Sequence, residues 1–132
     1  MSAAAPVILV IDDDEALLRL VELAFRSTRA RVVTHARGYG ALALIGSERP
    51  DVVILDAMMP GLDGPSVLEL VRADGELRTT RVVLWSALPK DQLAERAERG
   101  GADGYLEKTV GARQLVDQVA HWLLTWDGVA IR

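Results

Sequence analysis

The chain has 132 residues, a formal net charge of −4 and no cysteine, and half of its residues are hydrophobic while 26% are charged. This length and composition predict a single globular domain with a sizeable core. The lack of cysteine excludes a disulfide framework and a thiolate metal site, and without a basic cluster we expect no nucleic-acid surface.

The first residues give no sign of export. Residues 1–6 carry no positive charge, and the apolar run after them is too short for a signal-peptide core or a membrane span. We therefore expect an N-terminal tail over residues 1–6, a cytoplasmic protein and no membrane partner.

Short apolar runs rich in β-branched residues recur along the chain. They are continuous rather than alternating, which is typical of parallel strands covered on both faces. The runs cover residues 7–11, 32–33 with their flanks, 52–55 and 82–85, and a weaker fifth run covers residues 105–106.

Helical patterns lie between and after these runs. In the first, the expected core face is Leu17, Leu20, Val21, Ala24 and Phe25. In the last, it is Leu115, Val116, Val119, Ala120 and Leu123. We expect this last helix to end near Thr125, so that residues 126–132 form a C-terminal tail or the start of a linker.

Strands that alternate with helices of this length favour a parallel sheet with right-handed crossovers. The five units predict an α/β fold: a flavodoxin-like, doubly wound, five-stranded parallel sheet in strand order 2-1-3-4-5, with five helices. We expect one domain over residues 7–125.

A polar or charged side chain follows four of the five predicted strands. Asp12 and Asp13 follow the first strand, Asp56 the third, Ser86 the fourth and Lys108 the fifth. In open α/β sheets, ligands bind beyond the carboxyl ends of the strands. We therefore expect these side chains to share one site.

The chemistry of this set suits a cation and a phosphoryl group. Neighbouring carboxylates cannot all stay ionised without a raised pKa or a counter-cation, and oxygen ligands of this kind suit Mg²⁺. Lys108 and the Ser86 hydroxyl add donors for anionic oxygens. A carboxylate nucleophile in this setting can accept a phosphoryl group.

Each of these residues also has an ordinary explanation when it is taken alone. The aspartate run could cap a helix, and we assign Asp14 and Glu15 to that role. Asp56 could cap a turn, Ser86 could be a turn hydroxyl, and Lys108 could be a surface lysine. Their common position after the strands favours the shared site.

In its residues and their order, the chain resembles a receiver domain of the bacterial two-component response-regulator family, from residue 7 to about residue 125. The resemblance implies that Asp56 is the phosphoacceptor. It also implies that Asp12, Asp13 and Asp56 hold Mg²⁺ together with the backbone carbonyl of Met58.

The same resemblance assigns further roles around the site. Ser86 and Lys108 would contact the phosphoryl group, and Tyr105, three residues before the lysine, would be the switch aromatic. The stretch "MMPGLDG" after the phosphoacceptor also matches the family, with Pro60 and Gly61 shaping the loop that carries the carbonyl ligand.

The sequence departs from the family pattern in two places. Thr109 stands where the family usually has a proline behind a cis bond, so we expect the Lys108–Thr109 bond to be trans. Met58 and Leu88 occupy the two positions that flank the water attacking the phosphoryl group in the family. Because both are apolar, we expect slow loss of the phosphoryl group.

The leading hypothesis is a phosphorylation-dependent signalling module rather than an enzyme. A histidine kinase or phosphotransfer protein would phosphorylate Asp56, and the chain would then bind a downstream protein differently. By the resemblance, the partner-facing segments are residues 90–99, 105–107 and 112–124. These segments could also form a phosphorylation-dependent homodimer through the fourth helix, fifth strand and fifth helix.

Three alternatives stay open. One is a longer DNA-binding transcriptional regulator of which this chain is the receiver part. Another is a Mg²⁺-dependent phosphatase with an aspartyl-phosphate, although such enzymes usually carry a second aspartate where this chain has Met58. The last is a degenerate receiver that binds partners without phosphorylation, against which the complete set of site residues argues.

Overall fold

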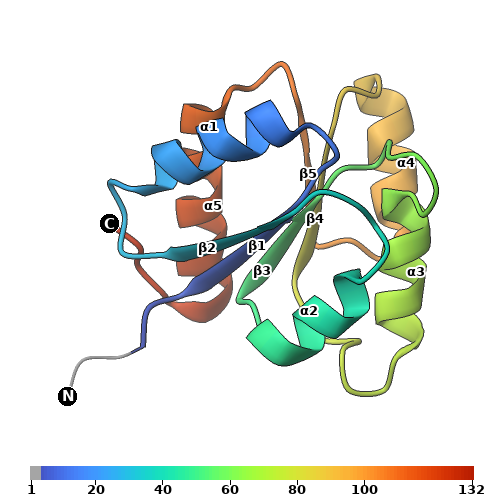
Figure 1. Cartoon of the computed structure of the whole chain (residues 1–132), viewed down its shortest axis with the longest axis horizontal. Coiled ribbons are helices and arrows are strands. Elements are labelled where there is room, and N and C mark those ends of the chain that lie inside the picture. The colour runs from blue at the N-terminus through green and yellow to red at the C-terminus, as the bar shows by residue number, and fades with distance from the viewer. Residues whose placement is uncertain (1–3) are drawn as a thin grey trace.

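The computed structural model describes residues 4–132 as a parallel sheet with helices on both faces (Figure 1). Residues 1–3 of the expected N-terminal tail lie outside the described residues. The elements in chain order are β1 (Val7–Ile11), α1 (Glu15–Phe25), β2 (Arg31–His35), α2 (Ala41–Glu48), β3 (Val52–Leu55), α3 (Gly64–Ala73), β4 (Val82–Ser86), α4 (Lys90–Gly100), β5 (Gly104–Glu107) and α5 (Ala112–Asp127).

The strands lie in the order β2-β1-β3-β4-β5, and every neighbouring pair is parallel. The predicted fold class, strand order and number of helices are therefore confirmed. β3 and β4 are buried along their whole length, as continuous apolar runs predict. β2 is half-buried because it forms one edge of the sheet.

Two apolar layers cover the sheet. α1 and α5 lie on one face, and α2, α3 and α4 lie on the other (Figure 1). Successive strand residues point to opposite faces, so that Leu55 and Leu84 pack toward α2, α3 and α4 while Ile54 and Trp85 pack toward α1 and α5. This double covering fixes the sheet, and with it the positions of the groups at the strand ends.

None of the helices between residues 4 and 132 combines the length and the apolar character that a membrane crossing requires.

The start of α1 agrees with the sequence, and its core face agrees except at Leu20. The Asp14 carboxylate accepts a hydrogen bond from the Leu17 N–H at 3.1 Å, which confirms Asp14 as the N-cap. The residues buried on α1 are Leu18, Val21 and Phe25. The prediction for Leu20 was wrong, because its side chain is 56% exposed. Apolar residues cover more than one stripe of this helix, and docking against α5 and the sheet selects the stripe through Leu18.

The last helix, α5, extends past Thr125, where it was expected to end. α5 continues to Asp127, where Trp126 stacks on Trp122 with ring centroids 5.7 Å apart, and Gly128 ends the helix with a φ of 65°. The chain then turns back, and Ile131 is buried against the α1/α5 layer. Its carbonyl accepts a hydrogen bond from the Arg29 N–H at 2.8 Å. Residues 128–131 thus pack on the domain, and a linker role for residues 126–132 stays a prediction.

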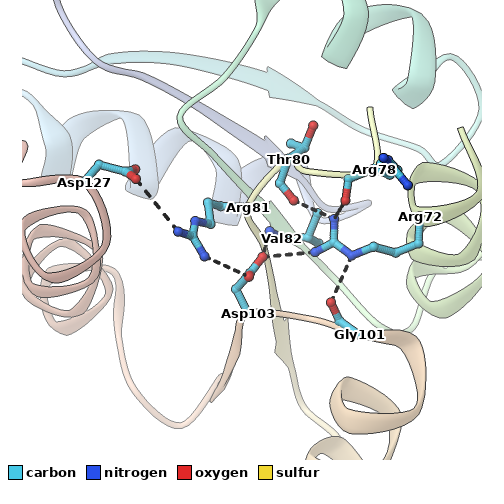
Figure 2. A network of polar contacts seen from close by, with 8 residues as sticks. All are labelled: Arg72, Arg78, Thr80, Arg81, Val82, Gly101, Asp103 and Asp127. Carbon is cyan, nitrogen blue, oxygen red and sulfur yellow. Dashed lines mark hydrogen bonds and ion pairs between the residues drawn. The ribbon is translucent and has the colours of Figure 1, made fainter. Parts of the chain in front are cut away.

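A polar network joins α3 to β4 and β5 at the amino-terminal ends of these two strands (Figure 2). The Asp103 carboxylate lies 3.0 Å from the Arg72 guanidinium and 3.3 Å from that of Arg81, and it accepts a hydrogen bond from the Val82 N–H at 2.8 Å. Arg72 also donates to the carbonyl oxygens of Gly101, Arg78 and Thr80. The network therefore anchors the starts of the two strands whose far ends carry Ser86 and Lys108.

Replacing Asp103 by alanine should lower the free energy of unfolding by about 2–3 kcal/mol. The substitution removes a charged acceptor from the Val82 N–H and leaves the half-buried Arg72 guanidinium without its carboxylate partner. Urea unfolding followed by circular dichroism measures the change. As a control, Glu95→Ala removes an exposed ion pair with Arg99 and should cost no more than about 0.5 kcal/mol. Equal losses in the two variants would contradict a structural role for the network.

Candidate functional site

The carboxyl ends of β1 and β3 bring two aspartates together. Ile11 and Leu55 are partners in the parallel register, and each is followed directly by an aspartate, Asp12 or Asp56. The Asp56 N–H donates to the Ile11 carbonyl at 2.9 Å, which extends the strand pairing into the site. The adjacency that strand order 2-1-3 predicts for these two residues is therefore present.

Three carboxylates form the acidic part of the site. One oxygen from each of Asp12, Asp13 and Asp56 lies within 4.8 Å of the others. Asp12 and Asp56 are only 1% and 3% exposed, while Asp13 is exposed to solvent. Buried carboxylates at this separation repel one another, so the site favours a positive charge among them.

Lys108 supplies one such charge from the loop after β5. Its Nζ lies 2.7 Å from Asp12 Oδ2 and 3.3 Å from Asp56 Oδ2. Its backbone N–H donates to the Ser86 carbonyl at 2.8 Å, which ties the start of the loop to the end of β4. Burial alone would lower the pKa of Lys108, but the two carboxylates outweigh burial and raise this pKa above its ordinary value of 10.5. The ammonium therefore stays charged at neutral pH.

Asp12 is only partly satisfied by this arrangement. Its Oδ1 accepts a hydrogen bond from the Asp14 N–H at 3.0 Å. Its buried Oδ2 accepts no hydrogen bond of good geometry from residues 4–132, although it forms the close ion pair with Lys108. An oxygen in this condition is available to a further positively charged partner.

The surroundings of the Asp56 carboxyl raise its pKa. Burial raises its pKa from the ordinary value of 3.8 to about 6, and the negative charge of Asp12 adds to this rise. The hydrogen bond from the Met58 N–H, 3.1 Å from Oδ1, and the charge of Lys108 act in the opposite direction. Asp56 is therefore still mostly ionised above neutral pH, and its carboxylate can act as a nucleophile.

The remaining predicted residues differ in how far they are buried. Ser86 is fully buried, and its Oγ accepts a hydrogen bond from the Leu88 N–H at 3.3 Å. The Leu88 side chain is half-buried against the core, whereas that of Met58 is 54% exposed. Tyr105 is half-buried in β5, opposite Leu84 of β4. The metal-ligand role of the Met58 carbonyl, the rate-setting role of the Met58 and Leu88 side chains and the switch role of Tyr105 stay predictions.

The first peptide bond of the loop after β5 has the predicted trans form. Every peptide bond between residues 4 and 132 is trans, including Lys108–Thr109, as expected for a chain with threonine in place of proline.

Gly64 contributes to the site, although it is not among the residues expected from the sequence. It is the first residue of α3, and a Cβ there would lie 2.1 Å from the Asp56 carbonyl oxygen. The lack of a side chain therefore lets α3 begin directly against the backbone of the site. The available signal was "DGP": Asp63 caps the helix by accepting from the Ser66 N–H at 2.9 Å, and a proline follows the glycine.

Comparisons with known proteins agree with this geometry. The model of the family described as "Response regulator receiver domain" matches residues 8–120. The chain is 34% identical to the sensor protein GacS of Pseudomonas syringae pv. syringae over 135 residues, covering all of this chain and 14% of that protein. It is 36% identical to the transcriptional regulatory protein AfsQ1 of Streptomyces coelicolor over 110 residues, covering 83% of this chain and 48% of that protein.

A solved structure gives the same result for the fold. The receiver domain of the Francisella response regulator 1452 is 32% identical, with a TM-score of 0.76, and the match covers 86% of this chain and 93% of that one. The chain thus spans about a seventh of GacS and about half of AfsQ1 but nearly all of a receiver domain. The chain belongs to the response regulator receiver domain family and is a signalling module of the two-component type.

Proposed function

We propose that Asp56 accepts a phosphoryl group from a histidine kinase or phosphotransfer protein in a Mg²⁺-dependent reaction. The single observation that carries the proposal is the buried Asp56 carboxylate, which belongs to the acidic cluster and lies 3.3 Å from the ammonium of Lys108. The kinase or phosphotransfer partner and the cytoplasmic setting expected from the sequence belong to the same proposal.

The residues of the acidic cluster fit a magnesium ion. Mg²⁺ takes oxygen ligands, and one carboxylate oxygen from each of the three aspartates lies within 4.8 Å of the others, so one ion could draw on all three. The buried Asp12 Oδ2, which lacks a well-formed hydrogen bond within residues 4–132, supports the same assignment. Asp12, Asp13, Asp56 and the Met58 carbonyl would hold the ion. When bound, Mg²⁺ neutralises carboxylate charge and polarises the phosphoryl oxygens.

The transfer itself requires little from the chain besides placement and charge. An Asp56 carboxylate oxygen bonds to phosphorus while the phosphorus–nitrogen bond of the donor phosphohistidine breaks, and the electron pair of that bond stays on the imidazole. Lys108 Nζ and the Ser86 hydroxyl would donate to the oxygens of the transferred group. Ser86 and Tyr105 would then reposition and change the partner surface.

The proposal is tested with a small phosphodonor. Incubation with acetyl phosphate and Mg²⁺ should add one acid-labile phosphoryl group per chain, measured by intact-mass spectrometry, and an excess of a metal chelator should prevent the addition. A chain that gains no phosphoryl group from acetyl phosphate or from a histidine kinase would overturn the proposal in favour of a receiver that acts without phosphorylation.

Magnesium alone should raise the stability of the fold. Binding to the native site contributes RT ln(1 + [L]/Kd), which is about 1 kcal/mol when Mg²⁺ is several-fold above its dissociation constant. Asp13→Ala should weaken this response, while raising stability without metal because it removes a like charge. Thermal melts across a Mg²⁺ titration measure both effects, with Glu95→Ala as the control that keeps the full response. A melting temperature that stays constant into the high millimolar range would contradict the metal site.

Phosphorylation should also change self-association. The sequence-based surface comprises α4, β5 and α5, where α4 carries a largely charged exposed face and β5 forms the half-buried edge of the sheet. We propose a phosphorylation-dependent homodimer through this surface, tested by light scattering of the phosphorylated and unphosphorylated chain.

The similarity to AfsQ1 supports a second proposal, in which this receiver controls an attached DNA-binding part of a longer transcriptional regulator. The similarity to GacS supports attachment to a sensor protein instead. Sequencing the gene on both sides of this segment would show whether a DNA-binding part or a sensor part is attached. Both possibilities use the same phosphoacceptor.

A further inference from the structure

The ammonium of Lys108 lies against an aromatic ring as well as against two carboxylates. Nζ is 5.7 Å from the centre of the Trp85 ring, within the range in which a cation is attracted to an aromatic face. Lysine has four rotatable side-chain bonds, so holding its ammonium at one place is costly in entropy. A fixed ring beside Nζ holds the ammonium in place before the reaction. Less conformational entropy of the lysine side chain is then lost during the reaction itself.

Trp85 is itself held firmly. It lies in β4 and is only 1% exposed, and its register partner on β5 is Leu106, two residues before Lys108. Its side chain packs into the α1/α5 layer with residues such as Leu115 and Val116. The ring and the start of the Lys108 side chain are therefore fixed by the same pair of strands.

The indole of Trp85 does more than fill the core. Its Nε1 is buried and has no hydrogen-bond acceptor within residues 4–132. A buried donor without a partner lowers stability. Phenylalanine and leucine are apolar and have no such donor, so neither would carry this cost at the same position. Tryptophan, however, presents the most attractive face for a cation among the aromatic residues. The contact with Lys108 is a property that an aliphatic side chain would not supply.

We infer that Trp85 is a positioning residue, which holds the Lys108 ammonium beside Asp56 for phosphoryl transfer. This inference rests on the proposed function. The two carboxylates beside Nζ are also the proposed phosphoacceptor and a proposed metal ligand, so both have another task during the reaction. The Trp85 ring, by contrast, takes no part in the transfer or in metal binding, and it can stay beside the ammonium.

The test compares phosphorylation rates by acetyl phosphate at saturating donor. Trp85→Leu should be about tenfold slower than the native chain and Trp85→Phe about threefold slower, a tenfold change being equal to about 1.4 kcal/mol. Trp122→Leu is the matched control: it removes another indole that packs against the same apolar layer, beside Gly104 at the start of β5 rather than beside Lys108, and should leave the rate within about twofold.

A double-mutant cycle separates positioning from packing. In a Lys108→Gln background, Trp85→Leu should cause no further slowing, because there is no ammonium left to place. Without metal or donor, the Lys108 side-chain methylene next to Nζ should show an upfield NMR shift caused by the ring, which Trp85→Leu abolishes and Trp122→Leu preserves. Equal slowing by Trp85→Leu in both backgrounds would overturn the inference.

Fluorinated tryptophan keeps the shape of the ring while weakening its attraction for a cation. With Trp122 and Trp126 replaced by phenylalanine, the analogue enters only at position 85, and the rate should fall stepwise with the number of fluorines. A rate that does not respond to fluorination overturns the positioning role even if Trp85→Leu fails to fold. If the native chain takes up no phosphoryl group at all, it is the proposed function that fails.

Discussion

Replacing Asp56 by asparagine should abolish phosphoryl incorporation. The substitution keeps the size of the side chain and an oxygen that can accept from the Met58 N–H, but it removes the anionic nucleophile. Intact-mass spectrometry after incubation with acetyl phosphate and Mg²⁺ should show a single phosphorylated species for the native chain and none for Asp56→Asn.

Stability gives no competing explanation for such a loss. The folded-state pKa of Asp56 is raised to about 6, above its ordinary value of 3.8, so the ionised carboxylate is less favourable in the folded chain than in the unfolded one. A neutral amide should therefore leave the metal-free fold at least as stable at pH 7 and above. Circular dichroism melts check this point.

Asp63→Asn is the control for the phosphoacceptor. Asp63 is a nearby aspartate, but its carboxylate caps α3 through the Ser66 N–H. Because asparagine caps a helix about as well as aspartate, this variant should keep its fold and retain full phosphorylation. Full labelling of Asp56→Asn would place the acceptor on another residue and remove the basis of the proposed function.

The phosphorylated chain should be long-lived, and the double variant Met58→Asn with Leu88→Glu should lose its phosphoryl group about tenfold faster or more. Loss requires a water molecule to attack phosphorus opposite the aspartyl oxygen, and by family resemblance these two side chains flank that approach. Neither native side chain can accept a hydrogen bond strongly enough to orient the water. If each replacement lowers the barrier by about 1 kcal/mol, the two together produce this acceleration.

The structure supports the placement of both positions. The backbone N–H of Met58 donates to the Asp56 carboxylate, and that of Leu88 donates to the Ser86 hydroxyl. The backbone of each residue is therefore held next to a side chain of the site. Because the Leu88 side chain is half-buried and the Met58 side chain is exposed, Leu88 is the more fixed of the two.

Decay of the purified phosphoprotein, with excess Mg²⁺ and no donor, measures the rates of the native chain, the single variants and the double variant. Leu70→Glu, which changes an exposed leucine on α3, controls for added surface charge. A native half-life of seconds, or equal decay in the native chain and the double variant, would show that these side chains do not control the water. Slow decay would suit a lasting response such as gene regulation.

The sequence by itself determined the fold and the main members of the site. Continuous β-branched runs predict strands buried on both faces, and the alternation with helices leaves a parallel sheet as the favoured arrangement. In such a sheet, every strand ends at the same edge, so that Asp12, Asp56, Ser86 and Lys108 had to lie along it. These conclusions depend on the chemical type and order of residues, which the sequence states directly.

Only the tertiary structure decided which of several equivalent local arrangements is used. α1 has apolar residues on more than one stripe, and packing against α5 buries Leu18 and exposes Leu20. α5 ends at Asp127 rather than near Thr125, because Trp126 stacks on Trp122 and Ile131 returns to the core.

Contacts between distant segments were likewise beyond the sequence. Asp103 joins Arg72 and Arg81, and Lys108 lies over Trp85, because the strand register brings these residues together in space. A sequence pattern states the periodicity of each segment, but the register between strands and the rotation of each helix depend on the packing of all layers at once. That joint packing placed an aromatic ring and two carboxylates around one lysine.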